Sequence, residues 1–121
     1  MTNTTTNIIF CGVGGQGVLK GSEMTALTAF YEGLDVKKSE IHGLSQRGGS
    51  VISFVRFGEK IYAPTVVKGE CDYLVSFERM EALRYVGYLH DNSRVIINNQ
   101  QILPTSVTTG DKTYPQEIAP T

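Results

Sequence analysis

Apolar residues in this chain fall into short runs that are separated by glycine-rich and polar stretches. Segments with the character of strands occur at positions 8–11, 36–39, 50–57, 73–77 and 94–98. At positions 18–32 and 78–89, apolar residues recur at three- and four-residue steps, which predicts two helices. Strands that alternate with helices in this way indicate an α/β domain.

The two predicted helices each carry an apolar stripe that we expect to face the sheet. In the first helix the stripe consists of Met24, Leu27, Phe30, Tyr31 and Leu34, and Gly33 is the expected C-terminal stop. In the second helix it consists of Met80, Leu83, Val86 and Leu89. We expect Glu78 and Glu81 on the solvated face of that helix, and His90 as a residue that complements the dipole at its C-terminal end.

The order of these elements predicts how the sheet is built. The first strand, first helix and second strand form a βαβ unit, which favours parallel strands. Gly58 and Glu59 suit a two-residue turn, after which positions 60–63 would return antiparallel until Pro64 ends that strand. The fold class is therefore α/β: a three-layer Rossmann-like domain with a mostly parallel, mixed sheet that includes one β-hairpin. We expect a flexible lead-in at 1–6, the domain at 7–105, and an irregular tail at 106–121 that belongs to a longer domain.

Composition narrows the class of partner. The chain has 121 residues, 11 basic and 12 acidic, with a net charge of −1. This balance gives no basic surface for nucleic acid or anionic lipid, and no apolar stretch approaches the ~20 residues that span a bilayer. Cys11 and Cys71 lie far apart in the sequence, and Cys11 sits in an apolar strand, where a thiol acts as a small hydrophobe. We expect a cytoplasmic protein that binds neither nucleic acid nor membrane.

The first candidate site is the loop between the first strand and the first helix, formed by Gly12, Gly14, Gly15, Gln16 and Gly17. Glycine lets the backbone approach a ligand closely, and the helix that follows offers unpaired N–H groups and a favourable dipole to an anion. A tight packing turn, a dinucleotide site with Glu40 on the ribose, and a site for another anion or a protein partner all remain open. A P-loop is excluded, because Val18 follows Gly17.

The second candidate site follows the second strand. It comprises Glu40, His42, Gly43, Ser45, Gln46, Arg47, Gly48 and Gly49. Its side chains offer many hydrogen-bond donors, and the two glycines after Arg47 leave room for a carboxylate, a phosphate or a protein carbonyl. Both loops follow strands at the edge where open α/β sheets bind ligands. A solvated loop with a local ion pair is the alternative. We find no catalytic constellation and no metal-ligand set, which indicates a binding or assembly domain.

Together the two loops carry a resemblance to a known family. Gly12-Val13-Gly14-Gly15-Gln16-Gly17, followed by Lys-Lys-Ser-Glu-Ile-His-Gly-Leu-Ser-Gln-Arg-Gly-Gly-Ser-Val at positions 37–51, resembles the gamma-type domain of 2-oxoacid:ferredoxin oxidoreductases, and most of all its indolepyruvate branch. Residues 70–78, 81–85 and 95–98 and the later Pro104 extend the resemblance, which covers about residues 7–105. The Ser-Gln-Arg-Gly-Gly loop is its specific part.

The resemblance implies a division of labour between subunits. Such enzymes oxidatively decarboxylate a 2-oxoacid, here indolepyruvate, another arylpyruvate or a pyruvate-like acid, to an acyl-coenzyme A and pass the electrons to ferredoxin. Thiamine diphosphate and iron–sulfur clusters are expected on a large partner subunit, ferredoxin is reached through the complex, and coenzyme A is a plausible ligand of the shared edge. This chain would hold no cofactor alone and would be inactive alone, and it could form homo-oligomers. A free-standing NAD(P)-binding module and a purely structural assembly domain are the alternatives.

Overall fold

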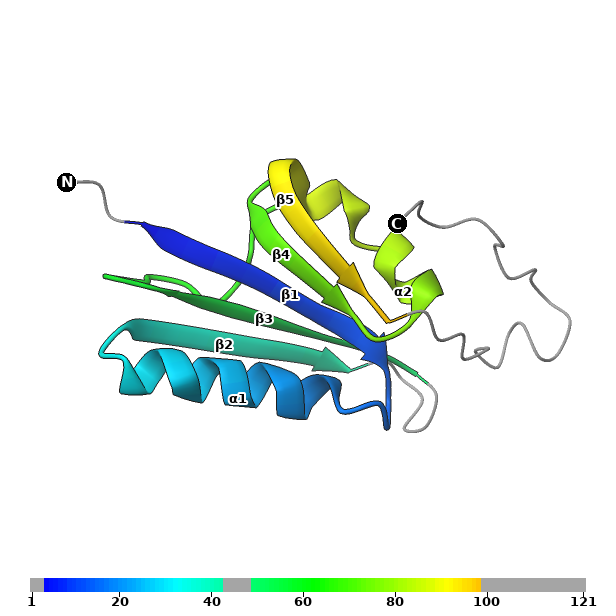
Figure 1. Cartoon of the computed structure of the whole chain (residues 1–121), viewed down its shortest axis with the longest axis horizontal. Coiled ribbons are helices and arrows are strands. Elements are labelled where there is room, and N and C mark those ends of the chain that lie inside the picture. The colour runs from blue at the N-terminus through cyan, green and yellow to red at the C-terminus, as the bar shows by residue number, and fades with distance from the viewer. Residues whose placement is uncertain (1–3, 43–48, 99–121) are drawn as a thin grey trace, which may run out of the picture.

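The computed structural model describes residues 4–42 and 49–98 (Figure 1). In chain order the elements are β1 (Thr5–Val13), α1 (Val18–Tyr31), β2 (Asp35–His42), β3 (Ser50–Gly58), β4 (Cys71–Ser76), α2 (Arg79–Leu83), a 3-10 turn (Val86–Tyr88) and β5 (Leu89–Ile97). Strands are present at the five segments 8–11, 36–39, 50–57, 73–77 and 94–98, and β1 begins inside the segment that the sequence assigned to the lead-in. No helix in the described part of the chain is long and apolar enough to cross a membrane.

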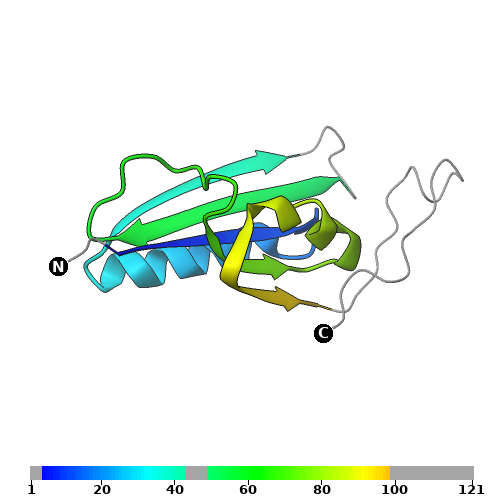
Figure 2. The same cartoon turned by 90° about the horizontal axis from the view of Figure 1, so that it is seen from above.

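The five strands form one mixed sheet in the order β2-β3-β1-β4-β5. β3 runs antiparallel to both of its neighbours, β1 and β2, whereas β4 runs parallel to β1 and to β5. β1, β2, β4 and β5 therefore all end at the same side, which we call the carboxyl end of the sheet; the opposite side is the amino end. α1 lies along one face of the sheet and α2 on the other, which gives three layers (Figures 1 and 2).

A hydrophobic cluster fills each side of the sheet. On the side of α1 it contains Ile8, Phe10, Val18, Val51 and Val55, with Leu19 and Ala26 of α1 packed against it. On the other side it contains Ile9, Cys11, Ile52, Phe54, Val66, Cys71 and Leu74, with Tyr85, Tyr88 and Leu89 against it. Alternate residues of β1 and β3 thus point to opposite faces, as the two-residue period of a strand requires. The α/β class and the mixed sheet are confirmed.

The predicted hairpin is placed wrongly. Residues 60–63 form no strand and belong to an irregular connection between β3 and β4. Side chains hold this connection instead of a ladder: Asp35 accepts from the Ile61 N–H at 2.8 Å, and Arg56 donates to the Ala63 carbonyl at 2.7 Å. Buried Ile61 and Val66 anchor it to the protein. The antiparallel hairpin is formed by β2 and β3, so β3 lies between the two parallel strands of the predicted βαβ unit.

The helix α1 has the predicted bounds but the opposite orientation. Its buried residues are Val18, Ser22 and Ala29, while the large side chains of the predicted stripe point to solvent. Met24, Leu27, Phe30 and Tyr31 are 63%, 46%, 62% and 80% exposed. The reason is that the sheet already presents large residues to α1, and small side chains on the helix allow close packing against them. Gly33 follows with φ of 88°, as a C-terminal stop requires.

The second predicted helix is also corrected. Only Arg79–Leu83 is α-helical, a 3-10 turn follows, and β5 starts at Leu89, so His90 lies in a strand and caps no helix. Its ring Nε2 is 2.9 Å from Asp72 Oδ1, while its Nδ1 accepts the Asn92 N–H at 3.1 Å. The Asn92 bond requires a lone pair on Nδ1, so the proton resides on Nε2 and the Asp72 carboxylate accepts it.

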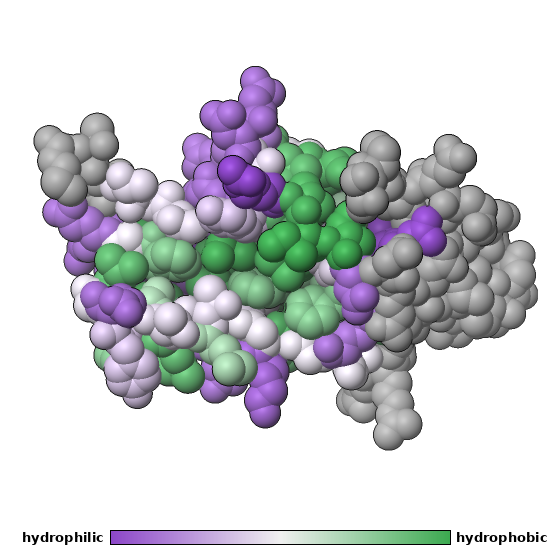
Figure 3. All heavy atoms as spheres, in the orientation of Figure 1, coloured by the Kyte–Doolittle hydropathy of each residue, from purple (hydrophilic) through white to green (hydrophobic). Residues whose placement is uncertain are grey.

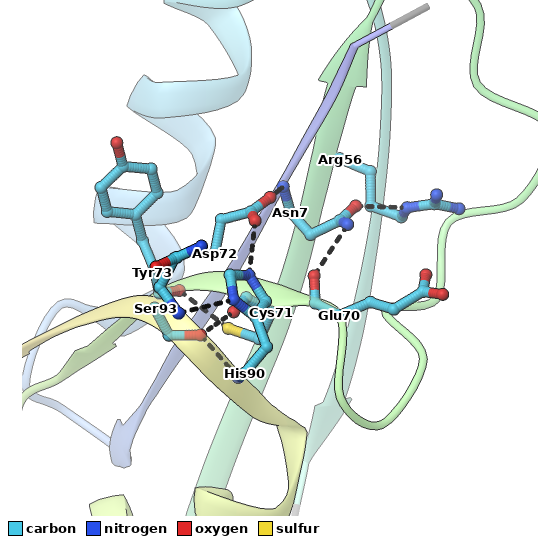
Figure 4. Close-up of polar contacts among 9 residues, drawn as sticks. Asn7, Arg56, Glu70, Cys71, Asp72, Tyr73, His90 and Ser93 are labelled. Carbon is cyan, nitrogen blue, oxygen red and sulfur yellow. Dashed lines mark hydrogen bonds and ion pairs between the residues drawn. The ribbon is translucent and has the colours of Figure 1, made fainter.

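His90 belongs to a polar network at the amino end of the sheet (Figure 4). Asn7 is its centre: its backbone N–H donates to Asp72, its amide donates to the Glu70 carbonyl, and its side-chain oxygen accepts from Arg56 Nε, at 2.8, 2.9 and 2.7 Å. Asn7 is only 7% exposed, so these bonds replace the water that it loses on folding. The network links β1, β3, β4 and β5.

Candidate functional site

The carboxyl end of the sheet brings the two predicted loops together. β1 ends at Val13, which pairs with Ser50 at the start of β3. One residue beyond on each side, the Gly14 N–H donates to the Gly49 carbonyl at 2.9 Å. The end of the second loop is thus bonded directly to the first. This contact confirms that the loops share one edge of the sheet, although they follow strands that are not neighbours.

Glycine is required at specific points of the first loop. Gly15 and Gly17 have φ of 94° and 88°, in the left-handed region that other residues rarely adopt. At Gly12 the limit is space, because an added Cβ would lie 2.8 Å from Gln16 Oε1 and 2.8 Å from Val18 Cγ2. Gly15 and Gly17 are exposed, whereas Gly12 is buried. The loop therefore offers its backbone to solvent between Gly14 and Gly17.

The side-chain amide of Gln16 makes two hydrogen bonds within the chain that shape this loop. Its Oε1 accepts the Val13 N–H at 2.7 Å, and its Nε2 donates to the Phe77 carbonyl at 2.9 Å. The side chain therefore closes the turn after β1 and ties it to the residue that follows β4. The sequence predicted Gln16 as a ligand- or partner-facing residue; the structure shows its side-chain amide engaged within the chain.

Among the described residues, no side chain caps the start of α1 and no acidic residue lies in its first turn. Gly17 is the N-cap residue and supplies no side chain. The unpaired N–H groups of a first helical turn, together with the helix dipole, favour an anion. Chemically, this end of α1 suits a phosphate, a carboxylate or the carbonyl groups of a protein partner.

Most of the second loop lies outside the described residues. This holds for Gly43, Ser45, Gln46, Arg47 and Gly48, and for the side chain of His42, the last residue of β2. Glu40 is described: it lies on β2 at the edge of the sheet and pairs with Lys38 at 2.7 Å. Both side chains are 29% exposed. Glu40 is thus already neutralised by a neighbour on its own strand.

Two buried carboxyl groups stand at the carboxyl end, and the sequence did not place them there. Glu78 is fully buried, and its Oε1 caps α2 by accepting the Glu81 N–H at 2.9 Å. Glu81 is 2% exposed; its Oε2 lies 3.1 Å from Arg84 Nε, and its Oε1 makes no hydrogen bond within the described residues. The prediction of a solvated acidic face is therefore wrong.

Burial changes the pKa of Glu81. It raises the pKa of the Glu81 carboxyl above its ordinary value, although the Ser50 hydroxyl and the Arg84 guanidinium oppose the shift. The sequence held one signal for this arrangement. Glu81 follows the N-cap residue Glu78 by three positions, directly after a buried strand, and this spacing is typical of the first turn of a helix. Ser76 supports the same turn, since its hydroxyl donates to the Glu78 carbonyl at 2.6 Å.

The cysteines are not arranged for chemistry. Burial raises the pKa of Cys11 to about 12 and that of Cys71 to about 11, so both stay protonated thiols and poor nucleophiles at neutral pH. Cys71 donates to the Tyr73 carbonyl. Within residues 4–42 and 49–98, no three His, Cys, Asp or Glu side chains gather in a group that could hold a metal ion.

Comparison with known proteins identifies the family. Residues 7–119 match the family Pyruvate ferredoxin/flavodoxin oxidoreductase, and the chain belongs to it. The indolepyruvate oxidoreductase subunit IorB of Thermococcus kodakarensis is 46% identical over 109 residues, which make up 90% of this chain and 54% of that protein. The subunit IorB of Archaeoglobus fulgidus is 46% identical over 110 residues, 91% of this chain and 54% of that protein. The chain thus spans about half the length of these curated relatives.

A solved structure shows the same fold inside a larger protein. The 2-oxoglutarate:ferredoxin oxidoreductase from Magnetococcus marinus, solved with 2-oxoglutarate, coenzyme A and succinyl-CoA bound, aligns with a TM-score of 0.72 at 18% identity. The alignment covers 98% of this chain and 19% of that one. At this identity the match establishes the fold: the same arrangement of strands and helices occurs as one part of a much longer oxidoreductase chain.

Proposed function

We propose that this chain is the gamma-type part of a 2-oxoacid:ferredoxin oxidoreductase whose substrate is indolepyruvate or a related arylpyruvate. Family membership and 46% identity to IorB subunits support this choice over a pyruvate-specific enzyme. The complex would convert the 2-oxoacid to an acyl-coenzyme A and pass electrons to ferredoxin in the cytoplasm. Thiamine diphosphate and the iron–sulfur clusters would reside on a large companion subunit.

The observation that carries the proposal is the meeting of the two loops at the carboxyl end. The bond from the Gly14 N–H to the Gly49 carbonyl, which joins the first loop to the last residue before β3, supports this arrangement. In α/β sheets this is the edge where ligands bind. Coenzyme A would suit it, because its phosphates match backbone N–H groups at a helix start and a guanidinium such as that of Arg47.

Within this edge the candidate residues take different roles. Gly14, Gly15 and Gly17 would bring backbone N–H groups to the ligand or the companion subunit, and the second loop would add side-chain donors. The donors are His42, Ser45, Gln46 and Arg47. Gly43, Gly48 and Gly49 would leave room around them, and Glu40 would offer a carboxylate at the start of the loop. Gln16 would act through the loop that it holds rather than by contact.

Reconstitution with the large subunit tests the proposal. The chain and the thiamine- and iron–sulfur-containing subunit from the same cell should co-purify and reduce ferredoxin with indolepyruvate and coenzyme A. Arg47→Ala should raise the apparent Kd for coenzyme A in this complex by about tenfold to a hundredfold, since one charge-assisted hydrogen bond contributes roughly 1.5–3 kcal/mol. Failure to co-purify, or a fully active large subunit that never needs this chain, would overturn the proposal.

The same material separates the two alternatives. An NAD(P)-binding module predicts micromolar binding of NADH by the chain alone in a calorimetric titration, and we expect none. A purely structural assembly domain predicts that Arg47→Ala weakens subunit association and leaves the affinity for coenzyme A unchanged. We expect the reverse pattern, with coenzyme A affinity carrying most of the loss.

A further inference from the structure

Phe77 contacts three parts of the first candidate site: the end of β1, the glycine loop (residues 12–17) and the start of α1. It follows Ser76, the last residue of β4, at the carboxyl end of the sheet. Its side chain packs on the side of α1, against the cluster that contains Phe10 and Val18. Figure 3 shows this side of the molecule, where hydrophobic residues gather over the second half of β5, the strand beside β4. Phe77 therefore extends the apolar packing to the end of the sheet where the two loops meet.

The backbone of Phe77 is bonded on both sides of the turn after β1. Its N–H donates to the Cys11 carbonyl at 2.8 Å, and its carbonyl accepts from Gln16 Nε2 at 2.9 Å. Cys11 lies in β1, and Gln16 is the residue whose side chain closes the turn. A Cβ added at Gly12 would lie 3.0 Å from Phe77 Cβ, so the loop backbone already packs closely against this residue. A shift of Phe77 would therefore move the glycine loop with it.

The ring of Phe77 reaches the start of α1. A Cβ added at Gly21 would lie 3.5 Å from Phe77 Cζ, which is an ordinary van der Waals distance. The Gly21 N–H donates to the carbonyl of the N-cap residue Gly17 at 2.9 Å, and this is the first intrahelical bond of α1. The ring thus supports the helix one turn after the N–H groups that a first turn leaves unpaired. The same residue holds the loop through its backbone and the helix through its side chain.

We propose that Phe77 is a positioning residue of the site at the carboxyl end, which sets the separation between the backbone N–H groups of the glycine loop and those at the start of α1. An anion bound by both sets needs them at a fixed separation, because hydrogen bonds weaken when donor and acceptor leave the range of about 2.7–3.2 Å. Displacement of α1 relative to the loop should therefore weaken binding even while the chain stays folded. This inference rests on the proposed function, because the ligand is that of the same site.

Phe77→Leu and Phe57→Leu form a matched pair of variants. Both phenylalanines are half-buried and pack against the cluster on the side of α1, but Phe57 is in register with Thr6, near the amino end of the sheet. Loss of either ring should lower the urea midpoint to a similar extent, because both substitutions remove buried apolar volume. Only Phe77→Leu should raise the apparent Kd for coenzyme A in the reconstituted complex, by about tenfold, as expected for a small misplacement of binding groups. Equal rises in Kd for the two variants would overturn the inference.

Amide hydrogen exchange in the chain alone tests the positioning role without a ligand. The N–H groups of Gly14 and Gly21 are protected by bonds to the Gly49 and Gly17 carbonyls. In Phe77→Leu these two amides should exchange about tenfold faster than in Phe57→Leu, because the loop and the start of α1 open locally. Equal exchange rates in the two variants would overturn the inference.

A second variant and the wild-type complex keep the outcomes distinguishable. If Phe77→Leu fails to fold, Phe77→Met takes its place, since methionine keeps an apolar side chain of similar volume without the ring. If exchange at Gly14 and Gly21 changes as expected but the wild-type complex binds no coenzyme A, the proposed ligand fails and the positioning role of Phe77 stands. If the wild-type complex binds coenzyme A and Phe77→Leu changes neither exchange nor affinity, the inference alone fails.

Discussion

The two ends of the sheet differ in how their polar groups are used. At the amino end, side chains satisfy one another: Asn7 bonds to Asp72, Glu70 and Arg56, and Asp72 bonds to His90. At the carboxyl end, side chains are withdrawn and backbone is presented. Gln16 turns inward to Val13 and Phe77, and the start of α1 has no side-chain cap.

This difference separates polar groups that stabilise from polar groups that remain available. Polar groups that already hydrogen-bond to one another have few donors or acceptors for a ligand, whereas unpaired N–H groups at a helix start can bind one. The buried Glu81 Oε1, which lacks a hydrogen-bond partner among the described residues, also lies at the carboxyl end. We therefore expect substitutions at the amino end to lower stability alone, and substitutions at the carboxyl end to lower both stability and ligand binding.

Gly12→Ala should give the largest effect and should change both properties. The added Cβ would approach Gln16 Oε1 and Val18 Cγ2 to 2.8 Å and Phe77 Cβ to 3.0 Å. Relieving this overlap should cost about 1–3 kcal/mol in the free energy of unfolding. It should also displace Gln16 and so weaken coenzyme A binding in the complex.

Gly87→Ala is the matched control, because nothing lies within 4 Å of a Cβ added there. Urea denaturation of both variants, with coenzyme A titration of the reconstituted complexes, measures the two properties. If Gly12→Ala were as stable as Gly87→Ala, the close packing of the glycine loop would not exist as described.

Asn7→Ala should lower stability and leave binding unchanged. The substitution removes two hydrogen bonds of the buried Asn7 side chain, to Arg56 Nε and to the Glu70 carbonyl, and each such bond contributes about 0.5–1.5 kcal/mol. Asn92→Ala, at an exposed position within β5, is the control, because Asn92 joins the described network through its backbone N–H. A change in coenzyme A affinity that exceeds the effect of Gly12→Ala would break the distinction between the two ends.

Backbone-determined features were predictable from the sequence. The glycines predicted the turn after β1. Gly17 and Gly33, which both have positive φ, lie at the two ends of α1, where the sequence placed the start and the end of this helix. β1, β3 and β4 were found because each contains a short apolar run, whereas β2 and the first half of β5 are mostly polar. The shared edge of the two loops followed from the rule that strands of one direction end together.

Features that depend on distant residues were not predictable. The stripe Met24, Leu27, Phe30 and Tyr31 has helical spacing, but which face of α1 is buried depends on the large residues already present on the sheet. The direction of β3 is not encoded in its own pattern, since periodicity is the same for either direction. Gln16 gave no local sign of its role, because Phe77 meets it only in the folded chain. The spacing of Glu78 and Glu81 indicated a helix start, but the burial of Glu81 depends on residues that are distant in the sequence.

Glu81→Gln should change how stability depends on pH. The folded pKa of Glu81 is raised above its ordinary value of 4.5, so its favourable contribution is complete below that value and is lost as pH rises through the folded pKa. The variant, which stays neutral, should therefore gain stability relative to the wild type as pH increases from 4.5 to 8. Glu59→Gln, in the exposed turn after β3, is the control. Urea midpoints across this range that run parallel for wild type and Glu81→Gln would contradict the assigned burial.

Glu40→Gln should give the smallest change in stability and the clearest answer about nucleotides. Glu40 pairs with Lys38 on an edge strand, and both side chains are partly exposed. Such surface pairs contribute about 0–1 kcal/mol, so the urea midpoint should hardly move. To bind a ribose, the Glu40 carboxylate would have to lose its ion pair with Lys38 and accept hydrogen bonds from two hydroxyl groups. We therefore expect no NADH binding by wild type or variant in calorimetry; micromolar affinity in the wild type that vanishes in Glu40→Gln would instead make the carboxyl end a dinucleotide site.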